Sequence, residues 1–156
     1  MTLFGTNFLS GTQVGVGTVG NVAVTPTQSS QVTFTAPTNP GQVGTVSTQP
    51  VTITTAGGTS TSGTTQIDYY LTPAITSVLP TSGTTGDQIT VNGTGFVNVD
   101  TVTFTDSATA TATAVFTPIS DTQLAATVPG GLATGAGTIT VHTCGGNSNA
   151  QAFTIT

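Results

Sequence analysis

Apolar and polar residues alternate with a period of two along much of the chain. In the segment 101–105, Val102 and Phe104 point to one side of an extended backbone and the threonines point to the other. The same alternation occurs in residues 32–35, 51–54 and 138–141. No segment shows the period of a helix, and glycine and proline turn signals separate the runs. The pattern therefore predicts an all-β protein built as a β-sandwich.

Three blocks of sequence occur twice in the same order. Residues 2–8 resemble residues 90–96, and residues 51–58 resemble residues 139–146 at the same offset. The third block, which ends at Pro37 in the first half and at Pro129 in the second, has drifted by a few positions. The repeat predicts two tandem β-sandwiches, residues 1–71 and residues 72–156.

The two copies differ in how they begin. The second copy opens with residues 73–86, which have no counterpart in the first copy. Within this segment Pro80 and Gly83 predict a bend that lets the opening strand cross between the sheets. The first copy is therefore expected to lack its opening strand and to have an open sheet edge. Either the chain is a fragment of a longer array, or a neighbouring subunit completes or covers this edge.

The second copy contains a combination of short motifs that is typical of one family. The motifs are Pro73-x-Ile75, Pro80-x-x-Gly83, residues 89–96 with Gly93-Thr94-Gly95-Phe96, Val102-x-Phe104, Gln123-Leu124, Val128-Pro129 and Gly145-Gly146 to Phe153. Together they resemble the IPT/TIG family of immunoglobulin-like domains. The resemblance covers residues 73–156 and, without the opening strand, residues 1–71. It implies two immunoglobulin-like β-sandwiches that serve as spacer, adhesion or assembly modules, and it brings no catalytic motif.

The same pattern assigns structural positions to glycines, prolines and phenylalanines. Gly93 and Gly95 predict a tight turn or bulge in which a side chain would collide, with Phe96 buried beside it. The full set of structural motif residues is Gly5, Phe8, Pro37, Gly57, Gly58, Pro80, Gly83, Gly93, Gly95, Phe96, Pro129, Gly145 and Gly146.

Composition excludes several classes of function. The 156 residues contain no Lys or Arg and five acidic residues, all Asp, so the net charge is -5. Binding to nucleic acid and attraction to anionic membranes both need cationic side chains. No apolar run is long enough for a membrane span, so membrane insertion is not expected. Catalysis by Lys, Arg or Glu is excluded as well, and His142 has no G-x-S-x-G partner, which predicts that the chain is not an enzyme.

Few residues are candidates for metal binding. Asp100 and Asp106 flank one predicted strand and are the candidates for a Ca²⁺ site, the alternative being turn residues that bond to the local backbone. His142 and Cys144 lie two positions apart but supply half of a Zn²⁺ site, and strand parity places His142 on the outer face. We therefore expect no cofactor, with Ca²⁺ as the alternative.

Three further residues are candidates for modification or binding. Cys144 lies in the predicted turn where the first copy has Ala56, and it could form an intermolecular disulfide or remain a plain turn thiol. Asn92 begins the sequon Asn-Gly-Thr and is a candidate for glycosylation. Tyr70 could stack on a sugar, although aromatic residues are few and core packing is the alternative.

These observations predict a non-catalytic structural or adhesion module of an extracellular or virion-surface fibre. Self-assembly into a filament through exposed sheet edges is the specific version of this hypothesis. The expected partners are copies of itself or neighbouring structural subunits, and cell-surface glycans are an alternative. A carbohydrate-binding module and a Ca²⁺-dependent adhesin are the rival functions.

Overall fold

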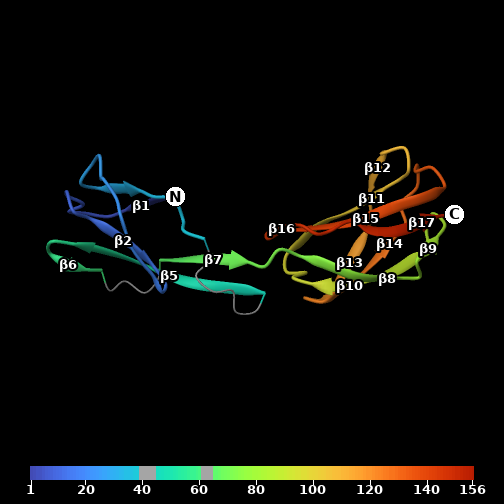
Figure 1. The fold of residues 1–156 in the computed structure, drawn as a ribbon, viewed down its shortest axis with the longest axis horizontal. Coiled ribbons are helices and arrows are strands. Elements are labelled where there is room, and N and C mark those ends of the chain that lie inside the picture. Colours follow the sequence, from blue (N-terminus) through green and yellow to red (C-terminus); the bar gives the residue numbers. More distant parts are fainter. Residues whose placement is uncertain (39–44, 61–64) are drawn as a thin grey trace. The chain divides into compact units, whose positions relative to one another are not determined.

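The computed structural model describes residues 1–38, 45–60 and 65–156, and these residues are all-β, as the alternation predicts (Figure 1). They divide into a first unit, residues 1–38, 47–60 and 65–69, and a second unit, residues 45–46 and 70–156. No helix of the described ranges has the length and apolarity to cross a membrane. The strands are β1 Thr2–Phe4, β2 Gln13–Val16, β3 Val19–Ala23, β4 Gln31–Thr33, β5 Val46–Thr55, β6 Gly58–Thr59, β7 Gln66–Tyr70, β8 Ala74–Leu79, β9 Ser82–Gly83, β10 Gln88–Thr94, β11 Val99–Thr105, β12 Thr111–Thr113, β13 Phe116–Ser120, β14 Gln123–Thr127, β15 Gly135–Thr143, β16 Gly146–Asn147 and β17 Gln151–Ile155.

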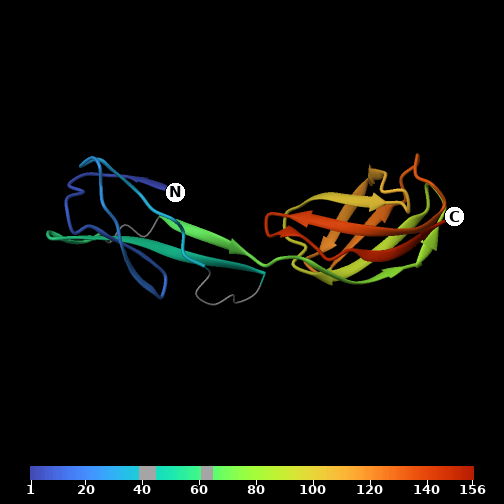
Figure 2. The same ribbon diagram turned by 45° about the horizontal axis from the view of Figure 1, so that its top comes forward.

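The second unit consists of two sheets (Figure 2). One has the strand order β13-β14-β10-β8, and the other has the order β12-β11-β15-β17-β9 with β16 also paired to β15. Val102 and Phe104 on β11 are fully buried, whereas Thr101, Thr103 and Thr105, which alternate with them, are only half-buried, so the period of two is confirmed. The buried core is formed by Ile75, Val78, Ile89, Val91, Phe96, Val102, Phe104, Ala114, Leu124, Ala126, Val128, Ile139, Val141, Phe153 and Ile155.

The opening segment of the second unit belongs to both sheets. β8 pairs antiparallel with β10, and Ser82 and Gly83 of β9 pair in parallel with β17 in the other sheet. The Leu79–Pro80 peptide bond between them is cis. The predicted crossing of the opening strand from one sheet to the other is thereby confirmed.

The first unit also contains two sheets. β1 pairs with β4, and the second sheet has the order β3-β2-β5-β6 with β7 also paired to β5. The short alternating strands place their apolar residues between the sheets. The buried core consists of Leu3, Phe8, Val14, Val16, Val32, Phe34 and Val51.

Local structures recur between the units 88 positions apart. Asn7 and Gly95 both have positive φ, 62° and 73°, and each precedes a buried phenylalanine, Phe8 or Phe96. Ser60 accepts a backbone N–H from Ile53 at 3.1 Å, as Ser148 does from Val141 at 2.9 Å. Gly58 and Gly146, which begin β6 and β16, also have positive φ.

Gly93 lies where two neighbours leave no room for a side chain. A Cβ at this position would collide with the carbonyl oxygen of Ala74 on β8 and with the ring of Phe96. The register of β8 on β10 shifts between Asn92 and Gly93, which is the predicted bulge. Gly5 has the same relation to the ring of Phe8, since a Cβ there would lie 2.5 Å from Cζ of Phe8.

A Cβ at Gly93 would meet a backbone oxygen and a ring, whereas a Cβ at Gly5 would meet a ring alone. The same substitution should therefore have unequal effects at the two positions. Gly93→Ala should lower the free energy of unfolding of the second unit by about 3 kcal/mol, because both a backbone oxygen and a buried ring oppose the methyl group. Gly5→Ala should cost the first unit about 1 kcal/mol, because a single side chain has to shift. Urea denaturation followed by circular dichroism and by amide NMR signals measures both. Equal losses would contradict the assigned contacts.

Candidate functional site

Strand β1 pairs with β4 through one side of its backbone, and its other side faces away from β4. Met1 and Phe34 exchange backbone hydrogen bonds at 2.9 and 3.0 Å, and Gly5 donates its N–H to Ser30 at 2.9 Å. Backbone groups of alternate residues point in opposite directions along an antiparallel strand. The N–H and C=O groups of Thr2 and Phe4 therefore point away from β4, and we call this side the β1 edge. Among the described residues, β1 pairs with β4 alone.

A groove lies beside the β1 edge, between β1 and β5. It comprises a hollow of about 350 Å³ and an adjoining smaller one of about 50 Å³. The residues that define this β1–β5 groove are Leu3, Phe4, Phe8, Ile53, Ser60 and Thr65. The Phe4 side chain is 79% exposed, and Ile53 is partly exposed. Apolar side chains from both sheets of the first unit thus line this groove.

A hydroxyl-rich hollow of about 490 Å³ lies at the end of the first unit. Thr6, Asn7 and Ser10 contribute to it from the segment after β1, and residues 55–60 contribute from the turn between β5 and β6. Leu9, which is 65% exposed, adds an apolar side chain. We call this surface the polar hollow. None of its described lining residues carries a charge.

The carboxylate of Asp106 accepts hydrogen bonds from the backbone of two loops. Its side chain is 6% exposed and accepts the backbone N–H groups of Ala108, Ala110 and Ala133, each at 2.9 Å. These hydrogen bonds hold the pKa of Asp106 below its ordinary value of 3.8, the bond from Ala133 contributing most. The carboxylate thereby ties the β11–β12 turn to the loop before β15.

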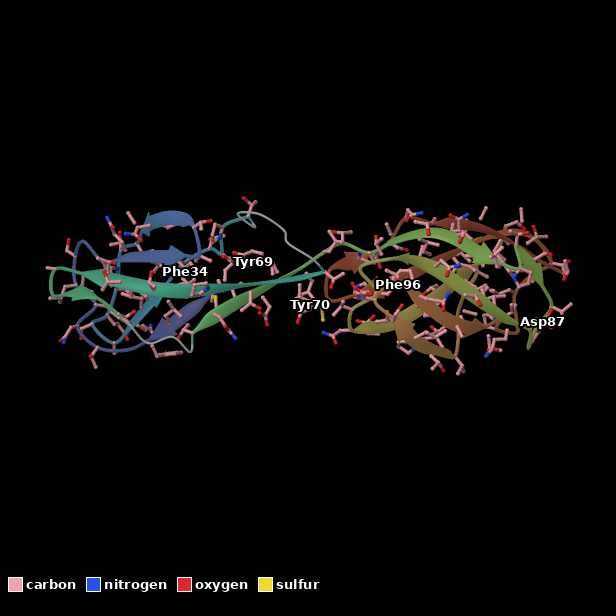
Figure 3. The ribbon with its side chains drawn as sticks, turned by 90° about the horizontal axis from the view of Figure 1, so that it is seen from below. Phe34, Tyr69, Tyr70, Asp87 and Phe96 are labelled. Carbon is pink, nitrogen blue, oxygen red and sulfur yellow. The ribbon has the colours of Figure 1, made fainter. Side chains whose placement is uncertain are left out.

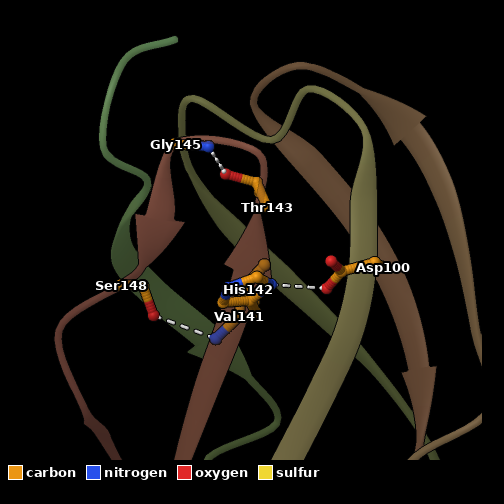
Figure 4. A network of polar contacts seen from close by, with 6 residues as sticks. All are labelled: Asp100, Val141, His142, Thr143, Gly145 and Ser148. Atoms are coloured by element: carbon orange, nitrogen blue, oxygen red, sulfur yellow. Dashed lines mark hydrogen bonds and ion pairs between the residues drawn. The ribbon is translucent and has the colours of Figure 1, made fainter. Parts of the chain in front are cut away.

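Asp100 and His142 form a pair on neighbouring strands (Figure 4). Oδ1 of Asp100 on β11 lies 2.7 Å from Nδ1 of His142 on β15. The side chains are 56% and 44% exposed, so water screens the pair. The hydrogen bond with His142 lowers the pKa of Asp100. His142 lies opposite the buried Ile139 and Val141, on the outer face that strand parity predicts.

The other aspartates also have local partners or lie in turns. Asp68 accepts the hydroxyl of Thr48 at 2.6 Å. Asp87, at the turn before β10 (Figure 3), accepts the N–H and the hydroxyl of Thr84 at 2.8 and 3.0 Å. Asp121 is exposed in the turn between β13 and β14. These carboxylates stabilise turns and strand pairs, which is the behaviour expected of Asp in such positions.

The calcium candidates Asp100 and Asp106 lie at opposite ends of β11, which puts them roughly 20 Å apart along the strand. Within residues 1–38, 45–60 and 65–156, no three His, Cys or Asp side chains gather as metal ligands would. Cys144 is exposed in the β15–β16 turn and keeps a free thiol.

The modification and sugar-stacking candidates lie in paired strands. Asn92 is inside β10, where its amide nitrogen donates to Ser77 at 3.2 Å and its oxygen accepts from Gln123 at 2.8 Å. Tyr69 packs against the first core, and its hydroxyl donates to the carbonyl of Pro37 at 2.9 Å (Figure 3). Tyr70, the next residue, is half-buried.

Sequence reasoning included local backbone bonding as the alternative for Asp106, but it did not foresee the bond from Ala133, 27 positions away, or the pair of Asp100 with His142. The polar hollow had no signal in the sequence, since hydroxyl-bearing residues are spread over the whole chain.

The sequence model of the IPT/TIG domain matches residues 73–155. No curated protein matches the chain in sequence.

The chain is similar to several solved structures, among them a surface glycan-binding protein, SGBP-B, from a complex xyloglucan utilization locus in Bacteroides uniformis, with 17% identity and a TM-score of 0.46. The SGBP-B of a Bacteroides ovatus mixed-linkage glucan utilization locus, in complex with a mixed-linkage heptasaccharide, has 19% identity and a TM-score of 0.43. The gamma-CGTase of alkalophilic Bacillus clarkii has 20% identity and a TM-score of 0.48. The alignments cover 97%, 99% and 99% of this chain but 44%, 41% and 21% of those proteins. The chain thus spans less than half of each.

The lowered pKa of Asp106 predicts how stability depends on pH. Its ionised form is stabilised by folding, so its contribution is complete above pH 3.8 and is lost as the pH falls through the lower folded pKa. Asp106→Asn should lower the melting temperature at pH 7 and should flatten its decline below pH 4, because one acceptor oxygen and the charge are removed. Calorimetry from pH 2 to pH 7 measures both, with Ser107→Ala as the control. An unchanged pH profile in Asp106→Asn would contradict the assignment.

Proposed function

Because the chain belongs to the IPT/TIG domain family through residues 73–155, we propose that it is a non-catalytic structural and adhesion module of an extracellular or virion-surface assembly. The polar side chains support this proposal. Four of the five carboxylates accept hydrogen bonds from the protein itself, at Asp68, Asp87, Asp100 and Asp106. These hydrogen bonds stabilise turns and pairs of neighbouring strands. A structural module that holds its partners at a fixed spacing needs this rigidity.

The observation that carries the proposal is the β1 edge with the β1–β5 groove beside it. An unpaired strand edge offers backbone donors and acceptors to another chain, and exposed apolar side chains add a favourable free energy of burial. Phe4 supplies much of this apolar surface. The specific form of the proposal is assembly into a filament, in which sheet edges of successive subunits meet. In this proposal residues 1–71 and 72–156 are two tandem IPT/TIG-like sandwiches.

Assembly predicts a concentration-dependent increase in mass. In sedimentation velocity the chain should form larger species as its concentration rises, and salt should have little effect because few charges are present. The double variant Thr2→Lys with Phe4→Lys should shift this equilibrium toward monomer, since charged residues protect strand edges. Thr85→Lys, at an exposed turn of the second unit, is the control.

The same runs with and without reductant test the proposed intermolecular disulfide of Cys144, which would appear as a covalent dimer in the absence of reductant. A monomer at every concentration, in both redox conditions, would contradict the assembly proposal.

The polar hollow favours a second candidate function, the binding of a neutral glycan. Its hydroxyl and amide groups from Thr6, Asn7 and Ser10 suit the hydroxyls of a sugar, and the exposed Leu9 suits a sugar's apolar face. Tyr70 remains a candidate contact for the same class of ligand.

A glycan array followed by calorimetry tests this candidate. If a neutral oligosaccharide binds, the double variant Thr6→Ala with Ser10→Ala should weaken it by about tenfold or more, because two hydrogen-bonding groups are removed. Thr117→Ala, an exposed threonine of the second unit, is the control. An array without ligands, or equal affinity in both variants, would exclude this use of the polar hollow.

A further inference from the structure

The strand β8 lies at an edge of its sheet in the second unit. It pairs with β10 on one side, and among the described residues no strand pairs with its other side. Gly93 on β10 donates its N–H to Thr122, so it directs its backbone groups away from β8. Ile75 lies opposite Gly93 and therefore directs its own N–H and C=O groups to the other side of β8. We call this side the β8 edge.

The side-chain amide of Asn149 binds both of these backbone groups. Its Oδ1 accepts the N–H of Ile75 at 2.8 Å, and its Nδ2 donates to the carbonyl oxygen of Ile75 at 3.1 Å. A residue of a neighbouring antiparallel strand would form the same pair of hydrogen bonds. One side chain thus takes the place of a strand at this position, and we call the two bonds the Asn149 clamp.

Asn149 is held in place by the opposite sheet. The residue before it, Ser148, donates its N–H to the carbonyl of Val141 on β15 at 2.8 Å and accepts the N–H of Val141 at 2.9 Å (Figure 4). The hydroxyl of Ser148 also donates to the carbonyl of Asn149 at 2.8 Å. Val141 is fully buried, so the clamp is anchored at the core of the second unit.

The chain just before β8 is fixed at the same end of the second unit. A Cβ at Gly145 would collide with the carbonyl oxygen of Leu71, and a Cβ at Gly95 would lie 3.1 Å from Cα of Pro73. The two glycines therefore allow a close approach of the backbone, and all four residues belong to the second unit. This close packing keeps the beginning of β8 in register with the clamp.

Without the clamp, the β8 edge would suit another strand. Its outward positions are Ile75 and Val78, since Val78 lies opposite Val91, which directs its backbone groups toward β14. Residues 73–79 carry no charge, whereas charged side chains are a common protection of strand edges. With the clamp formed, Val78 is the one outward position left, which is too little for a strand to pair with.

Going beyond the proposed function, we propose that the Asn149 clamp keeps the second unit out of edge-to-edge assembly. While Asn149 holds Ile75, the β8 edge cannot pair with a second copy of the chain. When Asn149 leaves Ile75, the β8 edges of two copies pair antiparallel, because the same edge on both copies is uncharged and no like charges meet. Asn149 thus directs assembly to other edges, such as the β1 edge.

The variant Asn149→Ala tests the clamp, because it removes both bonds. It is made in the background of Thr2→Lys with Phe4→Lys, in which assembly through the β1 edge is suppressed. In sedimentation velocity the clamp variant should dimerise at a concentration about tenfold or more below that of the background alone. In the dilute monomer, amide hydrogen exchange at Ile75 should be faster by about tenfold or more, with exchange at Val91 on β10 unchanged.

Three matched variants separate gating from a purely structural role. Asn149→Asp keeps an acceptor for the N–H of Ile75 and places a charge at the edge, so it should remain monomeric. Leu79→Lys, at a side chain that is 59% exposed, should abolish the association of Asn149→Ala. Thr85→Lys, at an exposed turn, should leave that association unchanged. A purely structural role would lower the melting temperature without making association depend on position 79.

Two measurements keep the test decisive if Asn149→Ala does not fold. Asn149→Ser is a smaller change whose short side chain also cannot bridge both groups of Ile75, and it should associate in the same way. In the unchanged chain the Ile75 amide should be protected from exchange although it lies at an edge. Rapid exchange there, clamp variants that stay monomeric, or association that Leu79→Lys does not reduce would each overturn the proposal.

The outcome is separable from that of the proposed function. If the unchanged chain is monomeric at every concentration, self-assembly falls, and Asn149→Ala is then compared with the unchanged chain directly. If the unchanged chain assembles but Asn149→Ala adds no association in the background variant, the gating role of Asn149 falls while the assembly module stands.

Discussion

The backbone groups at the edge of a β-strand have to be paired or covered, and this requirement organises both units. In the second unit β10 has β14 on one side and β8 on the other, and the crossing to β9 carries the chain into the opposite sheet. Proteins commonly protect edges with lysine, which this chain lacks. Among the described edge strands, β13 instead contains a proline, Pro118, which has no N–H to offer to another strand.

The absence of Lys and Arg also decides what the carboxylates do. Asp106 is stabilised by three backbone N–H groups, and Asp87 by the N–H and hydroxyl of Thr84. Asp100 pairs with His142. Each carboxylate with a described bond is thus used to hold a turn or a strand pair, because backbone amides and hydroxyls replace the cations that would otherwise offset its charge.

Some of these features can be predicted from the sequence because they depend on neighbouring residues, and others cannot because they depend on distant ones. Burial of Val102 and Phe104 and the steric need for Gly93 follow from local patterns, so they could be predicted from neighbouring residues. The contact of Asp106 with Ala133 joins distant loops and depends on how they fold. The Asp100–His142 pair depends on a register shift between Val99 and Thr101, which no local pattern specifies. The open edge of the first copy stays a prediction from the repeat, whereas the groove lined by residues of β1 and β5 brings together segments about 50 positions apart, which no local pattern specifies.

A surface with so little charge changes which contacts govern association. With a net charge of -5 on 156 residues, repulsion between copies is weak and salt bridges contribute little to specificity. Threonine-covered faces are well hydrated and offer little free energy on burial. The β1 edge differs from them, because directional backbone groups lie beside exposed apolar side chains such as Phe4. If copies of this chain associate as proposed, backbone pairing and apolar burial at this edge are the interactions that would give the contact its specificity.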